Sequence, residues 1–284
     1  MRPLVGAIPE PAERASSALR RCPRATIILG PATAPAPLDE SAPAVDPARA
    51  VDPAPAVDPA RAGARVPLVH QVPGTADLWV AVPMADAESP TVPGSRARLE
   101  VLDEILGGAA GGRVRRVVVV EGRVQRPGTA TQRHVALGIS HDLPDAALLG
   151  VGTDLALIRL RAEKILLTDH DGVTHIEPDD LATSGPDPFT DLEGHWLDHL
   201  NDPRCEVVAR IALRVCRCLP AQRPLLVGID RAGVDMEIVD RDGHPRRQRL
   251  PFAEACTVVS ELGTQLRLLA GGARYPLDRA ALRP

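Results

Sequence analysis

The order of apolar and polar positions divides the chain into two parts with different secondary structure. Residues 24–177 contain short runs of valine, isoleucine and leucine separated by turn residues, which predicts about six β-strands. The strongest signal covers residues 114–126 and is centred on four consecutive valines. Further strands are expected at residues 25–29, 66–72, 77–82, 155–161, 164–168 and 173–176. Many short strands joined by turns are typical of an antiparallel β-barrel.

Helical spacing is expected at three places in this first part. Residues 10–22 form an amphipathic pattern with Pro11 in the first turn, where proline is well tolerated. Ser95 is suited to cap a second helix, whose apolar residues Leu99, Leu102, Ile105 and Leu106 follow helical spacing. Glycines in the 107–112 segment would end that helix, and residues 130–150 are expected to be helical or irregular.

The second part follows a different order of elements. Two helices are expected at 189–200 and 204–218, three strands at 225–229, 234–239 and 245–250, and a last helix at 258–269. Asp242-Gly243 is a typical turn between the last two strands. We therefore expect an α+β fold, in which an antiparallel barrel is followed by a small ααβββα domain. The expected segments are an N-terminal helix (1–23), a barrel domain (24–177), a linker (178–188), the α+β domain (189–271) and a tail (272–284).

A proline-rich segment interrupts the barrel at residues 32–65. It repeats Ala-Val-Asp-Pro-Ala at 44–48, 50–54 and 56–60. Frequent proline removes backbone donors, and the low apolar content cannot offset the entropy cost of ordering. The segment is expected to be a disordered or extended insertion. The alternative, a docking segment for a proline-recognising partner, lacks aromatic neighbours to support it.

Composition excludes several classes of function. The formal net charge is −4, and there are only two Trp, one Tyr and two Phe, so nucleic-acid binding is not expected. No apolar run reaches about 18 residues, and the first ten residues have no apolar core, so neither a membrane span nor a signal peptide is predicted. The five cysteines are scattered, which favours a reducing cytoplasm. They are Cys22, Cys205, Cys216, Cys218 and Cys256.

His195 and His199 are the first candidates for binding a metal or haem. They lie four residues apart on an expected helix, so both imidazoles can face the same way. The alternative is a solvated helix face. Cys216 and Cys218 point in different directions on a helix, which favours idle thiols over redox sensing.

Two other segments have simpler structural interpretations. The turn at 169–172 (Asp-His-Asp-Gly), with His175 beyond it, lacks calcium-loop spacing and is interpreted as a polar hairpin turn. The glycine run at 107–112 lacks the Lys-Ser/Thr ending of a phosphate-binding loop.

Three strings in residues 195–252 carry a resemblance to a known family. They are His199-Leu200-Asn201-Asp202, the string from Gly228 to Asp235 (Gly-Ile-Asp-Arg-Ala-Gly-Val-Asp), and Arg249-Leu250-Pro251-Phe252. They are similar to motifs of the small C-terminal domain of HugZ-type haem-degrading proteins. The first part resembles the FMN-binding split barrel of pyridoxamine 5'-phosphate oxidase-like proteins. The plant glutamyl-tRNA reductase-binding protein combines the same two parts. The family-motif residues are His199, Asn201, Asp202, Gly228, Asp230, Gly233, Asp235, Arg249, Pro251 and Phe252.

The chain departs from the family at the positions that would hold a cofactor. Pro203 and Arg204 stand where the family has Asp-His, and no histidine follows His244, although HugZ-type enzymes take an axial histidine from the C-terminal end. The segment at 83–90, where flavin barrels hold phosphate, has the acids Asp86 and Glu88, which disfavour a phosphate dianion. Arg96 and Arg98 could compensate for those acids.

These observations favour a non-catalytic or degenerate split-barrel protein that binds or regulates a partner, linked by the resemblance to tetrapyrrole metabolism. The alternative is a HugZ-type haem- or FMN-binding protein, extending to haem oxygenase activity. The cofactor is left open between haem and FMN. The resemblance also implies a homodimer, with a protein partner as a further expectation. The histidines that decide between the alternatives are His70, His134, His195 and His199.

Overall fold

The fold was analysed in a computed structural model, which describes residues 8–22, 24–30, 63–87, 95–105, 111–214, 223–239 and 244–271. It is a mixed α+β structure with a large antiparallel sheet and a small three-stranded sheet, which confirms the expected fold class. Contacts divide the chain into two compact units. The barrel unit comprises Glu10–Glu104 and Val114–Pro186, and the C-terminal unit comprises Met1–Pro9, Ile105–Arg113 and Asp187–Pro284, in each case only as far as these ranges are described.

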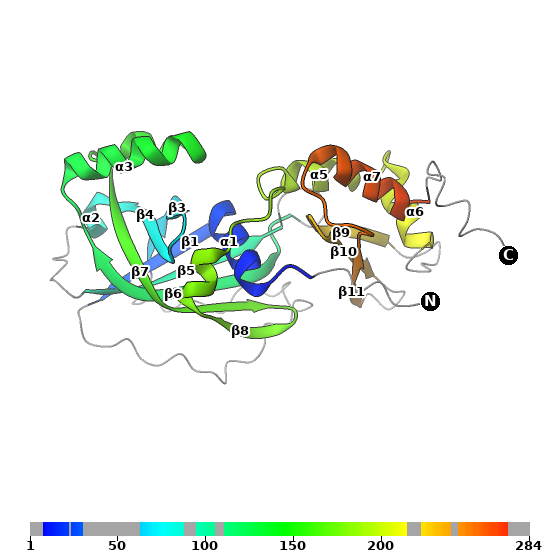
Figure 1. The fold of residues 1–284 in the computed structure, drawn as a ribbon, viewed down its shortest axis with the longest axis horizontal. Coiled ribbons are helices and arrows are strands. Elements are labelled where there is room, and N and C mark those ends of the chain that lie inside the picture. The colour runs from blue at the N-terminus through cyan, green and yellow to red at the C-terminus, as the bar shows by residue number, and fades with distance from the viewer. Residues whose placement is uncertain are drawn as a thin grey trace. The chain divides into compact units, whose positions relative to one another are not determined.

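The barrel unit is built on one curled antiparallel sheet (Figure 1). Its strand order is β2-β1-β5-β6-β7-β4-β3, and β8 pairs with β7. The strands are β1 (Arg24–Gly30), β2 (Ala64–Val66), β3 (Leu68–Gln71), β4 (Asp77–Pro83), β5 (Arg96–Glu104), β6 (Val114–Gln125), β7 (Leu155–Asp169) and β8 (Gly172–Ile176). The two ends of this order, β2 and β3, are separated by Pro67 alone, so continuity of the chain brings the edges of the sheet together.

The barrel unit also contains helices. They are α1 (Pro11–Arg21), α2 (Met84–Ala87), α3 (Thr129–Asp142), α4 (Pro178–Thr183) and the 3₁₀ helix η4 (Ala146–Gly150). Ala12, Ala15, Ala18 and Leu19 of α1 join the core with inward-facing residues of β1, β5, β6 and β7. The segment expected to be a linker, 178–188, begins with α4, whose Leu181 is buried in the same core. The small side chains of α1 explain how a helix packs closely against the sheet.

The predicted helix from Ser95 to Leu106 is wrong, because residues 96–104 form strand β5. Ala97, Leu99, Val101 and Asp103 are buried, and the residues between them are half-buried, which is the two-residue period of a strand. The helical interpretation relied on Leu102, which belongs to the other face of the sheet. Pairing of β5 with both β1 and β6 outweighs the local helical spacing.

The two strands expected at 155–161 and 164–168 form one strand, β7. Its first half pairs with β4 and its second half with β8, and the pairing with β6 shifts register where Glu121 meets Gly122. A Cβ atom at Gly122 would lie 1.8 Å from the backbone oxygen of Arg161. The glycine therefore permits the close approach of β6 and β7 at this irregularity.

The C-terminal unit has the expected ααβββα order. Its elements are α5 (Glu193–Leu200), α6 (Glu206–Arg214), β9 (Arg223–Asp230), β10 (Gly233–Val239), β11 (Pro245–Pro251) and α7 (Val259–Leu269). The strands form an antiparallel sheet in the order β11-β10-β9, and helices α5, α6 and α7 lie on one side of it (Figure 1). Leu197, Ile211, Met236 and Leu262 are buried in the core of this unit.

Several expectations fall wholly or largely on residues that the structure does not describe. Cys216, Cys218, Glu88, the tail 272–284 and most of the 32–65 insertion lie outside the described residues. The end of that insertion is described, and there Ala64 and Arg65 form part of β2. None of the described helices is both long and apolar enough to cross a membrane.

Candidate functional site

The family-motif residues of the α5–α6 connection hold the backbone together. Asn201 donates from Nδ2 to the backbone oxygen of Leu226 (2.8 Å), and its Oδ1 accepts from the backbone N–H of Leu226 (2.9 Å). This pair of hydrogen bonds fastens the end of α5 to strand β9. Oδ1 of Asp202 accepts from the backbone N–H of Arg204 (2.7 Å), which shapes the break between α5 and α6.

The motif residues of the small sheet form a second structural cluster. Oδ1 of Asp230 accepts from the backbone N–H groups of Ala232 and Gly233 at 2.8 and 3.1 Å, and from Arg249 at 2.5 Å. Arg249 also pairs with Asp235, which lies directly opposite it on β10. Burial opposes the charge of Arg249, yet the two carboxylates raise its pKa above the ordinary value. The cluster binds β11 to the β9–β10 turn.

The remaining motif residues fill tight positions in the same sheet. Gly233 faces Pro251 on β11, and a Cβ at Gly233 would lie 2.4 Å from the backbone oxygen of Leu250. Phe252 is buried, and Gly228 pairs with Asp235 across β9 and β10. Most of the motif residues therefore hold the backbone together, and two of them, His199 and Asp202, line a cavity.

That cavity lies in the C-terminal unit and has a volume of about 710 Å³. Its wall combines the imidazole of His199 with three arginines, a thiol and two acids. The lining residues in these classes are His199, Arg204, Arg210, Arg267, Cys205, Asp202 and Glu206. One arginine is already engaged, since Arg210 donates to Glu206 at 2.6 Å.

His195 and His199 are both exposed on α5, and His195 is not among the residues that line this cavity. The two imidazoles therefore do not both line this cavity, and a site shared by them stays a prediction.

A second cavity, of about 650 Å³, lies in the barrel unit. Arg20 of α1, His70 of β3 and Asp142 at the end of α3 contribute ionisable side chains to its wall. Nδ1 of His70 lies 3.8 Å from Oδ2 of Asp142, and Arg20 donates to that same oxygen at 2.9 Å. Burial lowers the pKa of His70 below its ordinary value, and Arg20 adds to this effect, while Asp142 opposes it. The imidazole is therefore neutral at neutral pH.

Gln71, next to His70, also lines this second cavity and is held by hydrogen bonds. Its Oε1 accepts from the hydroxyl of Ser16 (2.8 Å), and its Nε2 donates to the backbone oxygen of Leu181 (2.8 Å). Gln71 thus connects α1 and α4 to β3 beside His70.

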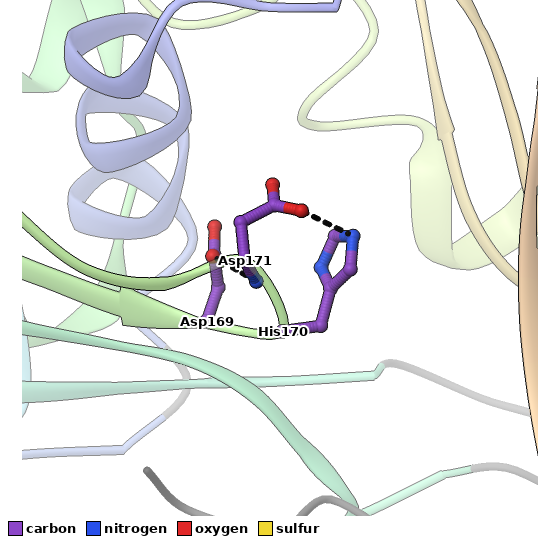
Figure 2. Close-up of side chains that lie close together, drawn as sticks. All are labelled: Asp169, His170 and Asp171. Atoms are coloured by element: carbon purple, nitrogen blue, oxygen red, sulfur yellow. Dashed lines mark hydrogen bonds and ion pairs between the residues drawn. The ribbon is translucent and has the colours of Figure 1, made fainter.

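The turn at 169–171 is the one described group of three potential metal ligands whose ligand atoms lie close together (Figure 2). Oδ1 of Asp169 accepts from the backbone N–H of Asp171 (2.9 Å), and His170 lies 3.2 Å from Asp171. Arg14 of α1 pairs with both carboxylates, at 2.6 and 2.9 Å. One guanidinium already pairs with both acids, which agrees with a polar turn fastened to α1.

A buried ionic cluster was missed by sequence analysis. Asp103 of β5 is fully buried and accepts two hydrogen bonds from Arg21, both at 2.8 Å, with Arg115 at 3.0 Å and Arg116 at 3.2 Å. Burial alone would raise the pKa of Asp103, but Arg115, Arg21 and Arg116 together hold it well below its usual range. Because residues 95–106 were expected to form a helix, the sequence did not indicate that Asp103 lies on the buried face of a strand.

The other described candidate residues from the sequence do not line either of these two cavities. His134 is exposed on α3, and Asp86 is exposed on α2. Arg96 pairs with Glu163, and Arg98 lies 3.7 Å from Glu121. Burial raises the pKa of the Cys22 thiol to about 12, so this cysteine is not a reactive thiolate.

Comparison with known proteins finds similarity at the level of the fold. No protein family model matches the chain, and no curated protein sequence matches it. Among solved structures, a haem-binding protein from Mycobacterium smegmatis matches with a TM-score of 0.53 and 18% identity, covering 94% of this chain and 98% of that chain. A protein of unknown function from Agrobacterium tumefaciens matches with a TM-score of 0.33 and 16% identity, covering 94% and 100%. The first match extends along nearly the whole of both chains, and at this identity it shows a shared fold.

Proposed function

We propose that this protein binds haem. The observation that carries the proposal is that each unit has a large cavity whose wall combines a histidine with arginine. Both volumes fall in the range of about 300–1,000 Å³ that small-molecule sites occupy. The fold shared with the haem-binding protein from Mycobacterium smegmatis supports the same function.

The residues present have the chemistry that haem requires. Imidazole nitrogen is a common axial ligand of haem iron, and guanidinium groups recognise carboxylates such as the two propionates. In the C-terminal unit, His199 stands with Arg204 and Arg267. In the barrel unit, His70 stands with Arg20. Bound haem supplies an iron centre that can bind oxygen and exchange electrons; the chain supplies the ligand and the surrounding pocket.

Haem binding is compatible with two uses that the sequence left open. A regulatory protein linked to tetrapyrrole metabolism would hold haem without turnover, and an oxygenase of the HugZ type would degrade it when given a reductant. Addition of a reductant and oxygen to the loaded protein distinguishes them, since only the second use removes the haem absorbance and releases a bile pigment.

The experiment that tests haem binding is the visible absorbance spectrum of the purified full chain, before and after addition of haemin and desalting. We expect a Soret band that stays with the protein. A parallel sample with FMN tests the flavin alternative, for which retained flavin absorbance would replace the haem proposal. A spectrum without either cofactor would return the protein to the non-catalytic binding class.

We also propose that the protein is a cytoplasmic homodimer that pairs through the outer face of the barrel sheet. Leu102 and Val117 alternate with the core residues of β5 and β6, are half-buried, and are not members of the barrel core. Light scattering during size exclusion should give about twice the mass of the chain. Val117→Glu should convert the dimer to a monomer, and a wild-type monomer would contradict this arrangement.

A further inference from the structure

Three separate elements bring ionisable side chains to the cavity of the barrel unit. Arg20 comes from the last turn of α1, His70 from strand β3, and Asp142 from the last residue of α3. All three line the same space of about 650 Å³. Because they lie far apart in the sequence, only the fold assembles them; Figure 1 shows α1 beside β3 in the barrel unit.

His70 differs from the other candidate histidines in its burial. Its side chain is 11% exposed, whereas His134, His195 and His199 are exposed. An axial ligand inside a cavity brings the porphyrin away from water, and apolar burial supplies most of the affinity for such a ligand. Apolar residues in the wall can contact the porphyrin faces: they are Pro73, Leu143, Ala182 and Pro186.

A carboxylate lies beside the His70 ring, farther away than the hydrogen bond that usually orients a metal-binding histidine. Nδ1 of His70 lies 3.8 Å from Oδ2 of Asp142, which favours Nε2 as the nitrogen left to bind a metal. Asp142 is itself held by Arg20, which donates to its carboxylate at 2.9 Å and to its backbone oxygen at 3.1 Å. Arg20 thus fixes Asp142, and the carboxylate of Asp142 attracts the Nδ1 side of the His70 imidazole.

We infer that His70 would hold the haem iron, that Asp142 would help to position its ring, and that Arg20 positions Asp142. The inference rests on the proposed haem binding and names its site. It assigns the ligand to the barrel unit, in place of the exposed pair His195 and His199 on α5. Asp142 and Arg20 are positioning residues, since neither would contact the iron.

The test is a haemin titration of the full chain and its variants, followed by the Soret band and by electron paramagnetic resonance of the ferric iron. His70→Ala should abolish the Soret shift, the surface control His134→Ala should keep it, and His199→Ala tests the cavity of the C-terminal unit. Because loss of a side chain can also disturb folding, His70→Gly is titrated with free imidazole, which should enter the vacated space and restore the ferric spectrum.

Asp142 has a test that a merely structural role would not pass. Asp142→Asn should weaken haemin affinity by about 10–100-fold, the usual effect of removing a carboxylate behind a ligating histidine. Asp142→Glu should restore part of that affinity. Circular dichroism of each variant should match the parent protein.

The outcomes separate this inference from the function on which it rests. If the parent protein retains haem and His70→Ala retains it equally, the assignment to His70 is overturned while haem binding stands. Loss of the Soret shift in His199→Ala alone would move the site to the C-terminal unit. If the parent protein retains no haem, the proposed function fails, and the assignment fails with it.

Discussion

At the residue scale, the family-motif positions are scaffold positions. Asn201 fastens a helix end to β9, and Asp230 with Arg249 holds the small sheet at its turn. Sequence strings located these residues but could not reveal their roles, because each role depends on a backbone group in another element. The same limit applies to Asp142, which has no sequence signal and becomes important only when α3 brings it to His70.

The buried carboxylate of Asp103 should be a large contributor to stability. Asp103→Asn keeps the side-chain size but removes the buried carboxylate with which Arg21, Arg115 and Arg116 form ion pairs. Breaking a buried ion pair in this way costs about 3–5 kcal/mol. Urea unfolding should show that loss, and the exposed control Asp198→Asn should change the free energy of unfolding by less than about 0.5 kcal/mol. Equal free energies of unfolding for the two variants would contradict a large contribution of Asp103 to stability.

The contribution of Asp103 should depend on pH in a defined direction. Its folded pKa lies below the unfolded value of about 3.9, so its stabilisation is complete above that value and is lost as the pH falls through the folded pKa. The stability difference between the parent protein and Asp103→Asn should therefore be constant near neutral pH and shrink below about pH 4. Urea unfolding of both proteins at a series of pH values measures this; a gap that widens in acid would show the opposite sign.

At the element scale, periodicity predicted most helices and strands, and it failed where two periods overlapped. In β5, leucines at helical spacing coincide with an alternating pattern that includes the small residue Ala97. The alternating pattern prevails because β1 and β6 supply hydrogen bonds on both sides, which no local signal records. The sequence predicts two strands where the structure has β7, because the apolar pattern is interrupted at Ala162 and Glu163. The pairing of β7 with β6 is irregular at the same place.

The close approach of β6 to β7 gives a prediction at this scale. Gly122→Ala would place a methyl group against the backbone of Arg161, and we expect a loss of about 1–3 kcal/mol, as for other overpacked positions. A Cβ atom at Gly138 on α3 would have nothing within 4 Å, so Gly138→Ala should stabilise by about 0.4–1 kcal/mol. Thermal unfolding of both variants measures the contrast. Similar melting temperatures for the two would argue against the tight crossing.

At the scale of the whole molecule, the sequence predicted the barrel followed by an ααβββα unit, and the structure confirms that order. The sequence could not show where the two ends of the long insertion lie in space. Ala64 pairs with Ile27, so the chain returns beside the strand from which it left. The insertion therefore begins and ends at neighbouring points of the barrel unit.

The effect of deleting the insertion should depend on whether the deletion stops before β2, which begins at Ala64. Replacing residues 32–62 with a short Gly-Ser linker leaves β1 and β2 paired and should leave the melting temperature nearly unchanged. Extending the deletion through Arg65 removes most of β2 and should lower it by several degrees. Differential scanning calorimetry of the two deletions compares them. A large decrease for the shorter deletion would mean that the removed residues pack on the fold.

Haem binding is decided most directly by the Soret absorbance of the desalted full-length protein after addition of haemin. We expect a stable Soret band in the parent protein and its loss in His70→Ala, with His134→Ala unchanged. A parent protein that emerges from desalting with no Soret band would show that this protein does not hold haem.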